Sequence, residues 1–307
     1  MSENLFILKP RAPFRLDLTV WTLRRRAENQ IDRWDGNTYR RVLVIGGEPI
    51  EVAVAQTGPP NLPRLRVTIR GAKSGADSKE SVTSLLNQML GLQVDLGKFY
   101  RFASRKAKIG PLVERFRGMR PPCFPSVFEA LVNAIACQQM SLTVGIVLLN
   151  RLSGTCGLAY SNNGIAAYAF PRPQDVAYRD PESLQQLGFS RQKVRALIES
   201  ANAIDDRKLD LEMLTEVADE LALARLQHLR GVGRWSAEYM LLRGLRRWHI
   251  FPGDDVGARN NLTRWLGLSG DLDYEGVRQT LAQWKPYGGL IYFHLLLDRL
   301  AEQGYVT

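Results

Sequence analysis

Residues 251–261, FPGDDVGARNN, place two aspartates side by side between a Pro-Gly turn and a segment of helical character. Aspartate is favoured at a helix N-cap, because its carboxylate accepts hydrogen bonds from the first free backbone N–H groups. Either Asp254 or Asp255 can act as that cap, and the other carboxylate is then left for different chemistry. A second acid without a role is unexpected in a chain whose formal net charge is +10.

A second segment, LRGVGRWSA at residues 229–237, has the residue types of a phosphate-binding hairpin. One helix is expected to end near Leu229, and Gly231-Val232-Gly233 then turns the chain into a second helix. Glycines permit such a turn and let a ligand approach the main chain, and the N–H groups at the helix start can bind a phosphate. Val232 is expected to point inward. The alternative for this spacing is an ordinary turn between two helices.

The composition favours a polyanionic partner. Lysine and arginine number 41 against 31 acids, with a pI near 9.7, which suits DNA, RNA or an anionic membrane. No apolar run approaches the roughly 18–20 residues of a membrane span, and the N-terminus lacks the organisation of a secretory signal. The three cysteines have no CxxC spacing and the three histidines do not pair at ligand spacing. We therefore expect an intracellular protein with no membrane contact, no disulfide framework and no metal site.

Strand patterns dominate the first part of the chain. Segments that alternate apolar and polar residues, separated by turn signals, lie at residues 14–20, 39–45, 50–56 and 63–70. Residues 78–92 have helical spacing. Together these segments predict an antiparallel sheet with one or two helices, in a domain of residues 1–110.

From about residue 111 the patterns are those of amphipathic helices. The helical segments are residues 125–154 (two helices), 180–188, 190–204, 211–229, 235–245, 274–284 and 289–304. Prolines at positions 171, 173 and 181 mark the loops between elements. We therefore expect an α+β fold, in which the sheet domain is followed by an all-α domain of residues 111–307.

The hairpin and the acid pair together resemble the signature of the helix–hairpin–helix DNA glycosylases, in which LxGVGxxSA is followed by an acid pair in a Pro-containing loop. Residues 133–141, 186–204 and 282–295 resemble further segments of that family. The β-rich N-terminal part is similar to the additional sheet domain of the bacterial 3-methyladenine DNA glycosylase II branch. The resemblance implies an all-α helix–hairpin–helix glycosylase domain, a double-stranded DNA partner with damaged bases, and a monomer.

Within this resemblance, Asp255 maps to the catalytic carboxylate and Asp254 is left for the helix cap or a loop hydrogen bond. A glycosylase breaks the N-glycosidic bond, and positive charge builds on the sugar as the base leaves, so a nearby carboxylate stabilises the transition state. At an effective dielectric of about 20, a unit charge about 4 Å away contributes roughly 4 kcal/mol. That corresponds to about a thousandfold in rate.

The resemblance also implies an aromatic base pocket, made by Trp235, Tyr239, Tyr287 and Trp284. The target base must leave the stack to reach the site, and alkylated purines carry positive charge that aromatic faces attract. Each of these side chains has the alternative of ordinary core packing. Superfamily members that also cut the strand have a lysine in place of Trp235. Tryptophan offers no nucleophile for a Schiff base, so no lyase step is expected.

The side chain that fills the hole left by the flipped base maps to Gln139, with Met140 as the alternative. The alkylation-repair branch often has an apolar residue at this position, and Gln139 departs from that pattern. A polar side chain here can hydrogen-bond the orphaned partner base, as in the 8-oxoguanine branch. The departure therefore leaves the lesion class open.

Phosphate contacts are implied for the main-chain N–H groups of Gly231, Gly233 and Trp235, assisted by the side chain of Arg234. The family hairpin often holds a monovalent cation on its carbonyls, and this is the one ion that the resemblance implies; no other cofactor is expected. The branch with an iron–sulfur cluster carries closely spaced C-terminal cysteines. This chain has no cysteine after Cys156, which excludes that branch.

These residues predict a monofunctional DNA glycosylase that flips out and excises alkylated purines, such as 3-methyladenine and 7-methylguanine, and leaves an abasic site in base excision repair. The alternatives are a glycosylase of the same fold for oxidised or deaminated bases, and a non-catalytic DNA-binding protein. Asp255 separates enzyme from binder, because a binder needs no carboxylate facing DNA. We expect the protein in the cytoplasm with the nucleoid in a prokaryote, and in the nucleus in a eukaryote.

Overall fold

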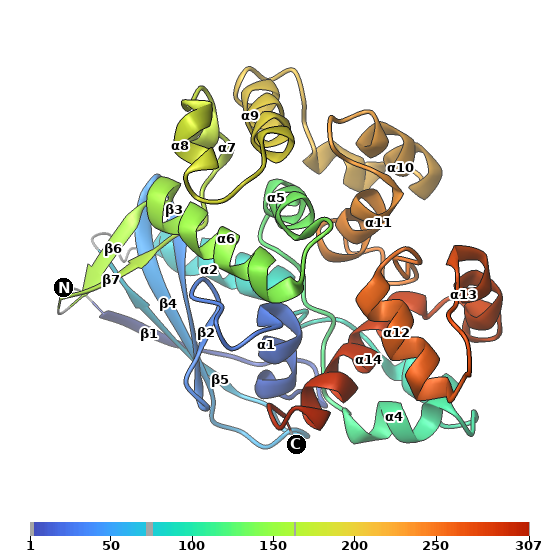
Figure 1. The fold of residues 1–307 in the computed structure, drawn as a ribbon. Coiled ribbons are helices and arrows are strands. Elements are labelled where there is room, and N and C mark those ends of the chain that lie inside the picture. The colour runs from blue at the N-terminus through green and yellow to red at the C-terminus, as the bar shows by residue number, and fades with distance from the viewer. Residues whose placement is uncertain (1–2, 72–75, 163, 307) are drawn as a thin grey trace.

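The computed structural model describes residues 3–71, 76–162 and 164–306, and its N-terminal part is built on a five-stranded antiparallel sheet (Figure 1). The strand order is β1-β5-β4-β3-β2. The strands are β1 (Glu3–Leu8), β2 (Arg33–Trp34), β3 (Thr38–Ile45), β4 (Glu48–Gln56) and β5 (Leu65–Arg70). A separate hairpin of β6 (Ala159–Asn162) and β7 (Ile165–Tyr168) contacts β4.

Helices make up most of the remaining chain. Those of the first half are α1 (Leu16–Arg24), α2 (Ala76–Met89), α3 (Gly97–Ala103), α4 (Ile109–Arg115), α5 (Val127–Cys137) and α6 (Leu142–Cys156). Those of the second half are α7 (Pro173–Val176), α8 (Pro181–Gln185), α9 (Arg191–Asp205), η1 (Glu212–Glu216), α10 (Asp219–Gln227), α11 (Arg234–Arg243), α12 (Val256–Leu266), α13 (Tyr274–Leu281), η2 (Ala282–Trp284) and α14 (Gly288–Glu302).

Three of the four predicted strands are confirmed as β3, β4 and β5, but the prediction of a strand at residues 14–20 is wrong. That segment forms α1, whose residues are buried on every side. A helix buried all round has no polar face, so its apolar spacing carries no helical period. The hydroxyls of Thr19 and Thr22 donate to carbonyls four residues back and satisfy their own polarity inside the helix. The edge strand β1, which pairs with β5, was not predicted.

The helical second part is confirmed, with two differences. The hairpin β6–β7 interrupts it, and the predicted helix 211–229 is divided into the short η1 and α10. No helix in the described part of the chain is long and apolar enough to cross a membrane. The fold class, α+β, is as predicted.

The sheet and the helices share their cores. One buried cluster runs from Phe6 to Leu245, and a second contains Leu18 together with Leu300. In Figure 1, α1 lies between the sheet and the helices of the C-terminal half, and it contacts α14. The predicted boundary at residue 110 therefore does not separate two independently packed cores. This arrangement brings side chains from α1 next to those of α11.

Candidate active site

The hairpin between α10 and α11 has the form that its glycines predict. Gly231 adopts φ +75°, a left-handed conformation, and a Cβ there would lie 3.1 Å from the Cβ of Ala196. Both facts favour glycine at this position. Val232 is buried in the core, as expected. Gly233 is the N-cap of α11, so the first N–H groups of that helix point out of the turn.

Gln138, the first residue of the neighbouring α5–α6 loop, contacts the hairpin, and Lys193 of α9 contacts the same loop. Nε2 of Gln138 donates to the carbonyl of Gly231 at 2.6 Å and to Oγ of Ser236 at 2.7 Å. Nζ of Lys193 donates to the carbonyls of Ala136 at 3.0 Å and Gln138 at 2.8 Å. The Lys193 ammonium thus binds the C-terminal end of α5, where a positive charge is favoured. The hairpin and the loop therefore form one unit.

The loop that carries the two aspartates is anchored to α11 by a buried acid. Oε2 of Glu238 accepts from the backbone N–H of Gly253 at 3.1 Å, and Oε1 accepts from the hydroxyl of Tyr274 at 2.7 Å. Burial raises the pKa of Glu238. The ring of Tyr274 packs so closely that a Cβ on Gly253 would lie 2.6 Å from it. Glycine at 253 is therefore a packing requirement, and it fixes where the aspartates begin.

The two aspartates divide their roles differently from the prediction. Asp255, not Asp254, is the N-cap of α12, and its Oδ1 accepts from the N–H of Ala258 at 2.9 Å. Asp254 instead accepts from Nε of Arg234 at 2.6 Å. The prediction that Asp254 caps the helix is wrong, because the chain enters the helix one residue later. Arg234, predicted to assist phosphate binding, is paired with Asp254 and stacked on Tyr274 at 3.7 Å.

The second oxygen of Asp255 faces an aromatic wall. Oδ2 accepts from Nε1 of Trp235 at 3.2 Å and from the hydroxyl of Tyr292 at 3.3 Å. Burial, followed by the charge of Asp255, raises the pKa of Tyr292 well above its usual value, so this hydroxyl keeps its proton. The aspartate is held in one orientation by the cap on one side and two donors on the other. One face of its carboxylate remains directed to the space in front of it.

That space is a cavity of about 1440 Å³. The hairpin residues, Asp255, Trp235 and Tyr239 line it, together with the α5–α6 loop and the first residues of α9 and α12. The rings of Trp235 and Tyr239 lie 5.6 Å apart. A cavity of this size exceeds the roughly 300–1,000 Å³ of a small-ligand pocket. It has room for a nucleotide together with part of the strand that carries it.

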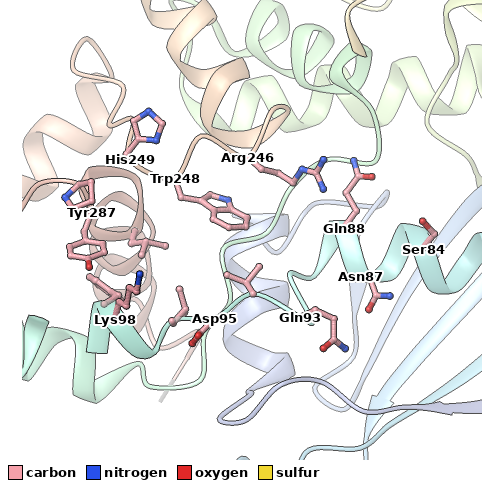
Figure 2. Close-up of a pocket in the computed structure, with 15 residues that line it drawn as sticks. Ser84, Asn87, Gln88, Gln93, Asp95, Lys98, Arg246, Trp248, His249 and Tyr287 are labelled. Atoms are coloured by element: carbon pink, nitrogen blue, oxygen red, sulfur yellow. The ribbon is translucent and has the colours of Figure 1, made fainter. Parts of the chain in front are cut away.

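The other two predicted pocket aromatics lie elsewhere. Tyr287 lines a separate cavity of about 820 Å³, in which Figure 2 shows it near Lys98 and His249, and its ring packs on Phe99 and Phe102. Trp284 is buried against Trp265. Neither lines the cavity in front of Asp255, which corrects the prediction for both residues, because their rings pack against other aromatic residues instead.

The third aromatic of the cavity is Tyr292 on α14, five residues after Tyr287, and sequence reasoning missed it. A helix turns by about 100° per residue, so side chains five positions apart point in different directions. Arg25 also lines the cavity and was also missed. It comes from α1, a segment with no local motif.

The two wedge candidates sit at the mouth of the cavity. Gln139 and Met140 lie in the loop between α5 and α6 and are exposed. Gln139 has φ +53°, a left-handed conformation that is costly for a residue with a side chain. Both side chains are thus exposed beside the cavity, and both remain candidates for the inserted side chain.

No group of three histidine, cysteine, aspartate or glutamate side chains within the described ranges is arranged to hold a metal ion. The hairpin carbonyl of Gly231 is already an acceptor for Gln138.

The α10–α11 hairpin and the Asp255 carboxylate next to it are features of a DNA-repair fold. Comparison with known proteins supports this assignment. Residues 132–286 match the model of the HhH-GPD superfamily base excision DNA repair proteins, and the chain belongs to this family.

The chain is 25% identical to DNA-3-methyladenine glycosylase 2 of Escherichia coli, over 95% of this chain and 96% of that protein. Its structure is similar to that of a 3-methyladenine DNA glycosylase from Archaeoglobus fulgidus, with a TM-score of 0.82, 27% identity and coverage of 95% and 97%. A 3-methyladenine DNA glycosylase from Schizosaccharomyces pombe in complex with abasic DNA matches with a TM-score of 0.54 and 25% identity, over 63% of this chain and 92% of that one.

Proposed function

We propose that the protein is a monofunctional DNA glycosylase that excises alkylated purines from double-stranded DNA and leaves an abasic site. The observation that carries the proposal is the Asp255 carboxylate, held by Trp235 and Tyr292 at the wall of a cavity directly behind the hairpin. The names of its relatives, which are 3-methyladenine DNA glycosylases, support the same activity.

Binding to the duplex is assigned to the hairpin. The N–H groups of Gly231 and Gly233 have no acceptor within the described part of the chain, and the start of α11 adds the positive end of a helix dipole. These groups can take a phosphate without any side chain, and the net charge of +10 draws the protein to DNA. The proposal includes a monovalent cation bound by carbonyl oxygens of the hairpin. The carbonyl of Gly231 is not one of them, because it accepts from Gln138.

The chemistry follows from the position of Asp255. A purine flipped into the cavity meets the faces of Trp235 and Tyr239, which attract a positively charged base. As the bond from sugar to base lengthens, positive charge develops on the sugar and Asp255 stabilises it. The carboxylate also has a free face with which to orient the attacking water. An alkylated base that is already cationic needs little further help to leave.

A lyase step is not part of the proposal. The position beside the hairpin that would need an amine holds Trp235. Lys193, which also lines the cavity, donates its ammonium to two carbonyls of the α5–α6 unit. A Schiff base requires an unprotonated amine free to reach the sugar, and this amine is held in place.

The proposal is tested with a panel of duplexes, each carrying one lesion, scored for abasic sites after incubation with the protein. We expect release of 7-methylguanine and 3-methyladenine by the wild-type protein and its loss in Asp255→Asn. Methylated duplex that keeps all its modified bases would overturn the proposal. Binding to undamaged duplex should weaken steeply with salt, because phosphate contacts release counterions.

A further inference from the structure

The guanidinium of Arg25 is a buried cation on the wall of the candidate active site. The residue is 4% exposed and lines the cavity that holds Asp255. Nη1 donates to the hydroxyl of Tyr239 at 2.7 Å, and Nη2 donates to Oδ1 of Asn133 at 2.6 Å. Both partners are uncharged, and no carboxylate in the described ranges pairs with Arg25. A buried cation without a carboxylate in direct contact is costly, so the position of Arg25 at the cavity calls for a reason.

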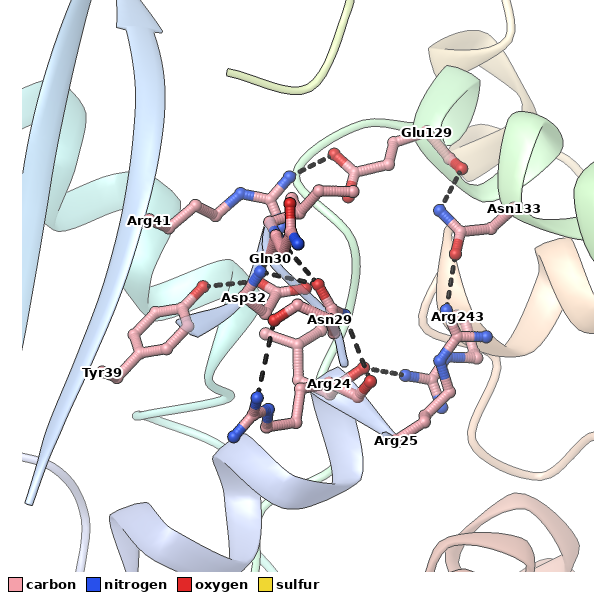
Figure 3. A network of polar contacts seen from close by, with 12 residues as sticks. Arg24, Arg25, Asn29, Gln30, Asp32, Tyr39, Arg41, Glu129, Asn133 and Arg243 are labelled. Atoms are coloured by element: carbon pink, nitrogen blue, oxygen red, sulfur yellow. Dashed lines mark hydrogen bonds and ion pairs between the residues drawn. The ribbon is translucent and has the colours of Figure 1, made fainter. Parts of the chain in front are cut away.

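A chain of polar contacts fixes Arg25 in this position (Figure 3). Arg25 ends α1 with φ 64°, and Nδ2 of its partner Asn133 donates to the carbonyl of Glu129 at 3.0 Å. The carboxylate of Glu129 accepts from Arg41 at 2.5 Å, and Arg41 also binds Asp32 at 2.8 Å. Arg41 carries one positive charge against these two acids, so the excess negative charge of the network balances Arg25 from a distance. In direct contact, however, the guanidinium of Arg25 has only the uncharged partners Tyr239 and Asn133.

A second buried guanidinium reinforces this charge. Arg243 is 0% exposed, and its Cζ lies 5.7 Å from the ring centroid of Tyr239. Its Nη2 donates to the carbonyls of Thr22 and Leu23, and no carboxylate within the described residues binds it either. Tyr239 thus contacts two buried cations and lines the cavity together with Asp255.

The hydroxyl of Tyr239 is free to donate a hydrogen bond. It accepts from Arg25, and its own O–H meets no acceptor in the described part of the protein. Burial raises the pKa of Tyr239, so the group is protonated at neutral pH. A hydroxyl that accepts from a cation in a low-dielectric site becomes a stronger donor, because chains of hydrogen bonds polarise one another. Tyr239 and Arg25 both line the cavity, so a base held there is within the surroundings of this donor.

We propose that Arg25 is a positioning residue that polarises the Tyr239 hydroxyl, and that this hydroxyl donates a hydrogen bond to the departing base. The pair thereby extends excision to damaged purines that carry no positive charge, such as hypoxanthine. This inference rests on the proposed function, because it concerns the same cavity and the same bond.

The reason lies in the charge of the leaving group. When the bond between C1′ and N9 breaks, its electron pair goes to the base, and water adds its hydroxide to C1′. The remaining proton of that water goes to solvent when the base was cationic, and ends on the base when the base was uncharged. A cationic N7-alkylated purine leaves as a neutral molecule. An uncharged purine leaves with negative charge on the ring, and a donor backed by two cations stabilises that charge.

The experiment compares two lesions in one duplex sequence, 7-methylguanine and hypoxanthine, by single-turnover excision. The quantity is the ratio of the hypoxanthine rate to the 7-methylguanine rate. We expect the wild-type protein to release both, and Tyr239→Phe and Arg25→Met each to lower the ratio about tenfold to a hundredfold, which is the range for losing a hydrogen bond to a charged group. Arg25→Lys, which keeps the charge and one donor, should restore part of the ratio.

Arg24→Met is the matched control. Arg24 is also a buried arginine at the end of α1, but it donates to the carbonyls of Ala27 and Trp34 and does not line the cavity. Its loss should lower the melting temperature and leave the ratio at the wild-type value. Tyr239→Phe retains the aromatic ring and removes only the hydroxyl. It therefore tests the inference even if Arg25→Met fails to fold.

Each result has a distinct meaning. Equal loss on both lesions in Arg25→Met and Tyr239→Phe overturns the inference and leaves the proposed function standing, as does a wild-type protein that releases only 7-methylguanine. A wild-type protein that releases neither base overturns both.

Discussion

Nε1 of Trp235 donates to Oδ2 of Asp255 at 3.2 Å, across the junction between the hairpin and α12. The other oxygen of the same carboxylate caps α12. One aspartate therefore serves the fold with one oxygen and faces the cavity with the other. Its structural and chemical roles can be separated by substitutions that treat the two oxygens differently.

Asp255→Asn removes the charge and keeps the shape. We expect base release to fall about a thousandfold, because the developing charge on the sugar loses its partner at about 4 Å. The amide has one oxygen, which can accept either from the backbone N–H of Ala258 or from Nε1 of Trp235, because its Nδ2 cannot accept. One of these two donors is therefore left unpaired, at a cost of about 1–3 kcal/mol. Single-turnover excision and urea unfolding measure the two effects, and binding to lesion-containing duplex should persist.

Asp255→Ala serves as the comparison. It loses the cap as well, which adds about 1 kcal/mol of destabilisation, while its excision rate should match that of the asparagine variant. A rate for Asp255→Asn within a few-fold of wild type would mean that the carboxylate acts only in the fold.

Asp254→Asn should behave in the opposite way. The pair of Asp254 with Arg234 is partly exposed, with side-chain exposures of 30% and 47%, so its loss should change stability by less than about 1 kcal/mol. Removing the acid frees Arg234 for a phosphate. We therefore expect tighter binding at low salt and a salt dependence steeper by about one counterion. Titration of duplex binding at several salt concentrations measures this, and weaker binding would contradict it.

Much of the site was predictable because its parts are local. The turn at Gly231, the inward Val232 and the acid pair can be read from one short stretch each, since backbone conformation and cap chemistry depend on neighbouring residues. The sheet was predictable for the same reason wherever one strand face is buried and the other is not. The prediction of a strand at residues 14–20 failed because α1 is buried all round. Its sequence therefore lacks the polar face that would have marked a helical period.

The parts that were not predictable depend on contacts between distant segments. Arg25 reaches Tyr239 across the shared core, and nothing in the local sequence distinguishes it from Arg24 beside it. Tyr287 and Tyr292 are both aromatic residues near the same turn, and only the direction of α14 decides that the second faces Asp255. The assignment of the cap to Asp255 rather than Asp254 depended on a helix start shifted by one residue.

Borohydride should trap no covalent complex between the wild-type protein and lesion-containing DNA. Lys193, whose amine lines the cavity, is hydrogen-bonded to two carbonyls, although burial lowers its pKa. A trapped adduct that disappears in Lys193→Met would show that this amine reaches the sugar after all. Denaturing gels of the reaction with and without borohydride provide the measurement.

Gln139→Gly should separate stability from function. Glycine relieves the left-handed backbone at this position, which we expect to stabilise the protein by about 1 kcal/mol. If Gln139 fills the hole in the duplex, excision from a paired lesion should fall about tenfold. The loss should shrink when the lesion lies opposite a mismatched base, because flipping then costs less. Met140→Ala, changed at the next exposed residue, is the control, and a larger loss there would identify Met140 as the wedge.

His294 should make the protein sensitive to mild acid. Burial lowers its pKa from 6.5 to about 4, and its Nε2 finds no partner in the described structure. Below pH 6.5 the imidazole of His294 is protonated in the unfolded chain and stays neutral in the folded protein. The free energy of unfolding therefore falls as the pH drops from 6.5 towards 4, by about 3 kcal/mol in total. His294→Leu removes this dependence. Urea unfolding at pH 7, 6, 5 and 4 should give a flatter profile for the variant, and parallel profiles for the two proteins would show that another group controls the acid limb.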